Sequence, residues 1–131
     1  MGLGEIIDEA NRRVLITSPD GTSGQAATRI IVDMARQRPE LVGWDWIHDV
    51  RRALGDVSVE DISQVARAFA DPPPGDTFTI FVSTDPHLGI WARAMDFEFV
   101  RRRHLCAPTP EAAIALLERH RAATIPVPSF S

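Results

Sequence analysis

Four side chains in this sequence could take part in acid–base or nucleophilic catalysis: His48, Asp49, Ser58 and His87. An imidazole or a carboxylate can move a proton, and a serine beside such a base can act as a nucleophile. His48 and Asp49 are consecutive in a segment expected to be a strand, where neighbouring side chains point to opposite faces of the sheet. They therefore form no dyad with each other, and an enzyme built on these groups needs them to converge in one cleft.

Composition excludes several other chemistries. All 14 basic residues are arginines, and the chain has neither lysine nor tyrosine, so no Schiff-base lysine, phosphate-loop lysine or tyrosine acid can operate. Cys106 is the only cysteine, which leaves no intramolecular disulfide and no cysteine-based metal cluster. His87 and His104 do not have the spacing of a known metal site. We expect no metal and no cofactor.

Charge and hydropathy restrict the location of the protein and the classes of partner that it can bind. The formal net charge is −4 and the pI about 5.5, which argues against a surface that grips a nucleic-acid backbone. No stretch of 18 apolar residues occurs, and the first residues show no basic region followed by an apolar run. The sequence therefore predicts a cytoplasmic protein with no membrane span and no nucleic-acid partner.

Hydrophobic periodicity predicts five strands and four helices. Runs rich in β-branched and aromatic residues, or alternating between apolar and polar, predict strands at 5–8, 13–17, 43–50, 77–83 and 102–107. Apolar stripes of helical spacing between turn and capping signals predict helices at 22–38, 58–69, 86–99 and from 110 onward.

This ββαβαβαβα order predicts the α/β class, with a mixed, mostly parallel five-stranded sheet flanked by about four helices. We expect one domain over residues 1–123 and a loosely held tail at 124–131.

Loops and charged runs offer further candidates. The turn at residues 21–24 could bind an anion at a helix N-terminus or simply cap that helix. Asp49 ends a strand at the edge where open α/β sheets bind ligands, although capping the following loop is the alternative. The three arginines at 101–103 could contact an acidic partner, but such runs usually form a solvated edge.

The helix expected at 86–99 has two apolar faces. Its core stripe comprises Leu88, Trp91, Ala92, Met95 and Phe99. Ile90, Ala94 and Phe97 add a second face, and a helix with two apolar faces must bury both. This pattern indicates a homodimer surface or a groove for an apolar ligand.

Several segments follow one another in the order and pattern of a known family. They are residues 46–51, the helix that begins at Ser58, residues 78–83, and the helical segments 85–95 and 110–117. On these segments the chain resembles the STAS superfamily, in particular its small stand-alone bacterial, SpoIIAA-like members. The resemblance implies the STAS/SEC14-like fold, shared with apolar-ligand carriers, and a regulatory role exerted through protein partners.

The resemblance also implies a phosphoacceptor candidate. Family antagonists are phosphorylated by a partner kinase within an Asp-Ser-Ser/Thr-Gly motif. The matching residues here are Asp56, Val57, Ser58 and Val59, which keep the aspartate but have valine beside it and no glycine. Ser58 is the candidate acceptor, and its alternative role is to cap the following helix together with Asp61.

Three functions follow from these observations. The preferred one is a non-enzymatic protein-interaction module, dimeric, acting on an unknown protein partner. The alternative is a module that binds a small apolar ligand or lipid, and the third is an enzyme that uses the acid–base groups above. The candidate surface for a ligand or partner comprises Asp49, Asp56, Ile90, Trp91, Ala94, Met95 and Phe97.

Overall fold

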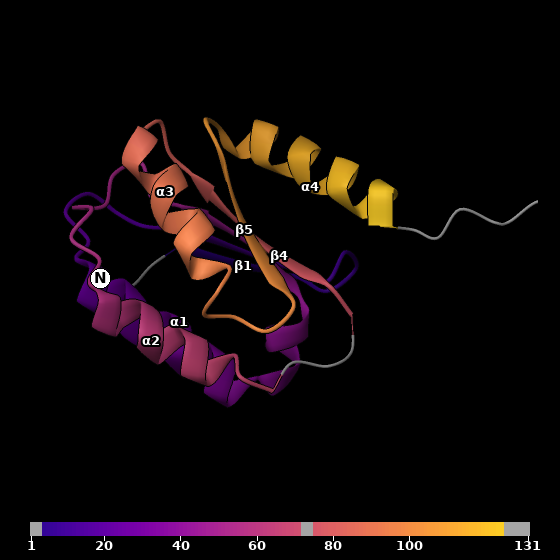
Figure 1. The fold of residues 1–131 in the computed structure, drawn as a ribbon, viewed down its shortest axis with the longest axis horizontal. Helices are drawn as coiled ribbons and strands as arrows, with labels where there is room; N and C mark the ends of the chain where they lie inside the picture. Colours follow the sequence, from indigo (N-terminus) through magenta and orange to yellow (C-terminus); the bar gives the residue numbers. More distant parts are fainter. Residues whose placement is uncertain (1–3, 72–74, 125–131) are drawn as a thin grey trace, which may run out of the picture.

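Five strands form one mixed sheet in the computed structural model, which describes residues 4–71 and 75–124 (Figure 1). The strands are β1 (Gly4–Asp8), β2 (Arg13–Thr17), β3 (Asp45–Asp49), β4 (Thr77–Val82) and β5 (Arg102–Ala107). They lie side by side in sequence order. β1 is antiparallel to β2, and each later strand runs parallel to the one before it. The predicted α/β class and mostly parallel sheet are confirmed.

The helices are divided unequally between the two faces of the sheet. They are α1 (Gly24–Gln37), the 3-10 helix η1 (Pro39–Gly43), α2 (Val59–Ala68), α3 (Pro86–Met95) and α4 (Pro110–Thr124). Because the three parallel crossovers all step in the same direction, right-handed connections place α1, α2 and α3 on one face. α4 follows the edge strand and returns across the other face, where it contacts β3, β4 and β5 (Figure 1).

Each face of the sheet has its own apolar core. The face under α1 and α2 buries a cluster made of Val14, Ile16, Met34, Ala35, Leu41, Val42, Trp44, Trp46 and Phe69. The face under α4 buries Ile47, Phe78, Ile80, Val82, Ala107, Ala113 and Leu117. Consecutive residues such as Trp46 and Ile47 belong to opposite clusters, as the alternation of a strand requires. Because the sheet is covered on both faces, neighbouring residues on opposite sides of β3 and β4 are buried.

The helix starts follow the capping signals of the sequence. The Ser58 hydroxyl accepts the N–H of Asp61 at 3.1 Å, and the Asp61 carboxylate accepts the N–H of Ser58 at 3.0 Å. This reciprocal pair confirms the predicted capping box. Ser23 likewise caps α1, and Asp85 caps α3.

Several predicted boundaries differ from the observed ones, and two of the differences have a structural cause. The third strand begins at Asp45 rather than at residue 43, because Pro39 starts a 3-10 turn that occupies the preceding residues. The third crossover helix ends at Met95 rather than at residue 99. It stops there because the Asp96 carboxylate turns back to hydrogen-bond with β5. Of the predicted tail, Thr124 ends α4, and residues 125–131 lie outside the described residues.

Candidate functional site

A cavity of about 400 Å³ lies between α3 and the pair α1 and α2. Its floor is the face of β3, β4 and β5 that lies under α1, α2 and α3. This floor is formed by Trp46, His48, Thr79, Phe81 and His104. The walls are mostly apolar and comprise Ala27, Ile31, Ile62, Val65, Phe69, Leu88, Trp91, Met95 and Phe99. This volume falls within the range of small-molecule sites in proteins, which combine apolar walls with a few convergent polar groups.

The cavity arises because α2 and α3, the helices of two successive crossovers, do not close over β4, the strand that lies between them in sequence. Phe81 on β4 sits in this gap and is only partly buried. Its ring centroid lies 6.2 Å from that of His48 on β3 and 6.2 Å from that of His104 on β5. The floor is therefore a row of three flat rings.

His48 forms the first polar position of the floor. Its Nε2 atom lies 2.9 Å from the hydroxyl of Ser18, and both residues are buried. Burial lowers the pKa of His48 to about 4, although the charge of Asp49 opposes this shift. The ring is neutral at neutral pH, so Ser18 and His48 present a pair of uncharged hydrogen-bonding groups.

His104 forms the second polar position, on the opposite side of Phe81. Its Nδ1 atom lies 3.0 Å from Oδ1 of Asp96, in the turn that follows α3. Burial lowers the pKa of His104 to about 4, while the hydrogen bond to Asp96 opposes that shift. Burial prevails because the imidazole side chain is only 2% exposed. The contact is therefore a hydrogen bond from a neutral ring, not an ion pair.

The cavity reaches the surface at the carboxyl ends of β3 and β4. Leu54 and Val57 of the β3–α2 loop line this opening and are exposed to solvent. Arg51 also lines the opening and is held by the carboxylate of Asp49, with Nη2 and Oδ2 2.7 Å apart. Ligands of open α/β sheets bind at this same edge, outside the carboxyl ends of the strands.

A close approach of two loops shapes the opening. The N–H of Gly24 donates to Oδ1 of Asp56 at 2.6 Å. A Cβ atom at Gly24 would lie 2.8 Å from the Cα atom of Val57, so any other residue would push the β3–α2 loop away. Ser23 and Asp56 thus accept hydrogen bonds from backbone N–H groups at the start of α1. This is the helix start at which the sequence allowed an anion to bind.

The predicted ligand or partner residues of α3 and the turn after it lie in two different places. Trp91 and Met95 line the cavity. Ile90, Ala94 and Phe97 lie on the outer side of α3 and the turn after it, with Ile90 63% and Phe97 91% exposed.

The remaining predicted residues make local contacts. Asp49 binds Arg51, Asp56 binds Gly24, and Ser58 caps α2. Asp56 and Ser58 also border a wide hollow between α1 and α2, lined by side chains of both charges. Such mixed charge is typical of a solvated surface.

The acid–base groups of the enzyme hypothesis make separate contacts. Among the described residues, His48 bonds to Ser18 and His87 to Asp85. No described hydrogen bond links His48, Asp49, Ser58 or His87 to another of these four. No group of three or more histidine, cysteine, aspartate or glutamate side chains in the described ranges could hold a metal ion. No helix in these ranges is long and apolar enough to cross a bilayer.

The sequence missed Ser18, Phe81 and His104 as site residues. Alternation along the strands does place His48, Phe81 and His104 on one face. What it could not provide is the gap between α2 and α3 that leaves this face open.

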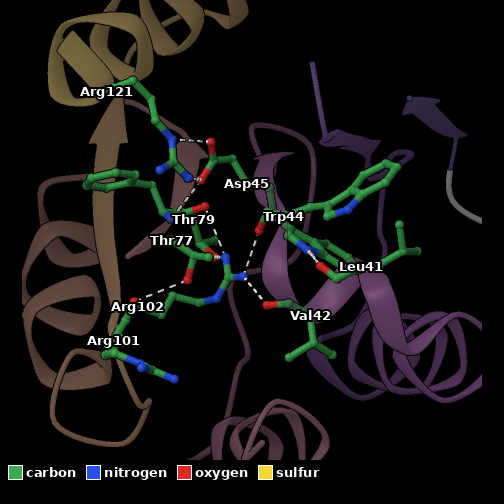
Figure 2. A network of polar contacts seen from close by, with 11 residues as sticks. Leu41, Val42, Trp44, Asp45, Thr77, Thr79, Arg101, Arg102 and Arg121 are labelled. Carbon is green, nitrogen blue, oxygen red and sulfur yellow. Dashed lines mark hydrogen bonds and ion pairs between the residues drawn. The ribbon is translucent and has the colours of Figure 1, made fainter. Parts of the chain in front are cut away.

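A second polar cluster, a largely buried charge network, lies at the amino ends of β3, β4 and β5, whereas the cavity opens at the carboxyl ends. Figure 2 shows the contacts of this network. Arg102 is 4% exposed and donates to the carbonyl oxygens of Val42, Trp44 and Phe78 and to the Thr79 hydroxyl. Asp45 accepts the N–H of Phe78 at 3.0 Å and hydrogen bonds from Arg121 of α4.

The expectation of a solvated arginine edge at 101–103 was therefore wrong for Arg102. Its side chain points inward by strand alternation, and its guanidinium is held by carbonyl and hydroxyl oxygens, while the nearby charge of Asp45 favours its charged state.

Comparison with known proteins adds no relative: no family model, no curated protein and no solved structure matches this chain.

Proposed function

We propose that this protein binds a small, mostly apolar molecule in the cavity between α2 and α3. The observation that carries the proposal is the floor of the cavity, where two neutral imidazoles flank an incompletely covered Phe81. An apolar core normally closes over an aromatic ring, because exposed apolar surface costs about 25 cal/mol per Å². A ligand that covers Phe81 and meets the polar groups would regain this stabilisation.

A fluorescent apolar probe, N-phenyl-1-naphthylamine, tests the proposal. We expect saturable fluorescence enhancement with one molecule bound per chain. Ala53 lines the opening, so Ala53→Phe should obstruct it and weaken the binding of the probe about tenfold or more.

The matched control is Ala115→Phe, which adds the same ring to the exposed side of α4 and should leave the affinity unchanged. Binding that is not saturable, or that responds equally to both substitutions, would contradict the cavity as the site.

The exposed side of α3 supports a second candidate function, pairing with a second copy of this chain. Ile90, Phe97 and Val100 are between 50% and 91% exposed. Ile90 lies on α3, and Phe97 and Val100 lie in the segment between α3 and β5; large exposed apolar side chains are often part of an interaction surface. The resemblance to STAS proteins favours the same role, and membership of that superfamily remains a proposal supported by the order of the elements.

Sedimentation equilibrium tests the dimer. We expect a wild-type dimer whose dissociation constant rises about tenfold in Phe97→Ser, since a single aromatic anchor often dominates an interface. Leu54→Ser removes a similarly exposed apolar side chain far from α3 in the sequence and should leave the dimer intact. A wild-type protein that stays monomeric at high concentration would rule this surface out as a dimer interface.

A further inference from the structure

The proton on His104 has a defined position. Oδ1 of Asp96 lies 3.0 Å from Nδ1 and also accepts the backbone N–H of His104 at 2.6 Å. A carboxylate oxygen only accepts hydrogen bonds, so Nδ1 must carry the proton that the ring donates. In a neutral imidazole the other nitrogen, Nε2, then has a free lone pair and can only accept.

No described residue donates a hydrogen bond to this Nε2 atom. In the described ranges, the only fully enclosed side-chain nitrogen or oxygen without a hydrogen-bond partner is Nε of Arg13. Nε2 of His104 is therefore not fully enclosed, and the residue to which it belongs lines the cavity. A molecule that fills the cavity would cover this acceptor, and because a covered acceptor without a donor is costly, such a molecule gains affinity by supplying one.

The charges around the cavity disfavour an anionic ligand. Arg51 is the one arginine among the described lining residues, and it is held by Asp49 at the opening. Asp61 and Asp85 add negative charge to the lining. A carboxylate placed beside Nε2 of His104 would meet a lone pair and no free cation, and burying an unpaired charge is strongly unfavourable.

The aromatic floor favours a flat molecule. The rings of Phe81 and His104 are nearly parallel, with 17° between their planes. The ring centroid of Phe99 lies 4.6 Å from that of His104. A planar ligand can stack on Phe81 while a group at its edge reaches Nε2 of His104.

We propose that the cavity selects a flat apolar molecule with a neutral hydroxyl group that donates a hydrogen bond to Nε2 of His104. This selectivity rests on the proposed function, because it concerns the same cavity. The ligand class is therefore phenols and comparable planar alcohols, rather than carboxylic acids or hydrocarbons.

Three matched compounds test the hydroxyl: 2-naphthol, 2-methoxynaphthalene and 2-naphthoate, titrated calorimetrically at pH 7. We expect 2-naphthol to bind at least about tenfold more tightly than either of the other two compounds, because only 2-naphthol can donate a hydrogen bond to Nε2 of His104. Equal affinity for the methoxy compound, or tightest binding of the naphthoate, would overturn the selectivity.

If N-phenyl-1-naphthylamine binds but 2-naphthol does not, the hydroxyl proposal fails while the proposed function stands. If none of the four compounds binds, both fail.

The imidazole nitrogens can be observed directly in wild-type protein labelled with ¹⁵N at histidine. We expect an unprotonated Nε2 on His104 in the free protein and a change of its chemical shift at saturating 2-naphthol. His104→Leu should abolish the preference for 2-naphthol over 2-methoxynaphthalene while N-phenyl-1-naphthylamine still binds. A proton on Nε2 in the free protein, or an Nε2 signal unmoved by 2-naphthol, would overturn the proposal even if the variant fails to fold.

Discussion

Replacing Asp45 with alanine is expected to lower the free energy of unfolding by about 2–3 kcal/mol, because it leaves the buried N–H of Phe78 without its acceptor and breaks an ion pair whose other partner, Arg121, is 40% exposed. The Asp45 side chain is 7% exposed and holds Arg121 of α4 and the N–H of Phe78 (Figure 2). Its charge also opposes the lowering of the pKa of Arg102, which burial brings to about 9. The guanidinium thus stays charged at neutral pH, and Asp45→Ala would remove its nearby counter-charge.

Urea unfolding at neutral pH measures this loss. Asp45→Asn keeps an acceptor for the N–H of Phe78 but removes the charge, so it should fall between the wild type and Asp45→Ala. Glu60→Ala is the control, because Glu60 pairs with Arg67 on the surface, where both side chains are 68% exposed. Such exposed pairs contribute about 1 kcal/mol at most. A cost for Asp45→Ala no greater than that of Glu60→Ala would contradict the role of the network.

The fold was predictable where the signal is local. The Ser58 and Asp61 capping box depends on residues three apart, and the strand alternation needs only neighbouring positions. The charge network is different, because Arg102 contacts Val42 and Trp44 across about 60 positions and Asp45 meets Arg121 across 76. Arginines at the start of an edge strand are usually solvated, and only the packing of Phe69 and the carbonyl groups of Val42 and Trp44 around Arg102 reverses that tendency.

The candidate site was predictable only in part, for a similar reason. Amphipathicity indicated that Trp91 and Met95 face an apolar ligand or the core, and both line the cavity. The polar groups opposite them depend on pairings that no local pattern encodes. Ser18 meets His48 only because β2 and β3 are parallel neighbours. Asp96 meets His104 only because α3 ends one turn earlier than its apolar stripe suggests.

Lowering the pH from about 6.5 to about 4 is expected to destabilise the protein through His48 and His104. Burial lowers the pKa of each to about 4, whereas an unfolded histidine titrates near 6.5. In this window the unfolded state binds more protons than the folded state, so the free energy of unfolding falls as the pH falls. Each histidine should contribute a loss on the order of 3 kcal/mol by the time the pH reaches 4.

The charged neighbours of both rings enter this expectation. Asp49 lies beside His48, while Asp96 and Arg102 act on His104, and the two aspartates favour protonation without overcoming burial. Urea unfolding between pH 7 and pH 4.5 should therefore show stability rising with pH, and His104→Gln should reduce this slope. His87→Gln should leave the slope unchanged, because the His87 side chain is 82% exposed. A stability that is flat across this range would mean that both imidazoles are as accessible to protons in the folded protein as in the unfolded chain. The neutral floor on which the ligand proposal depends would then be lost.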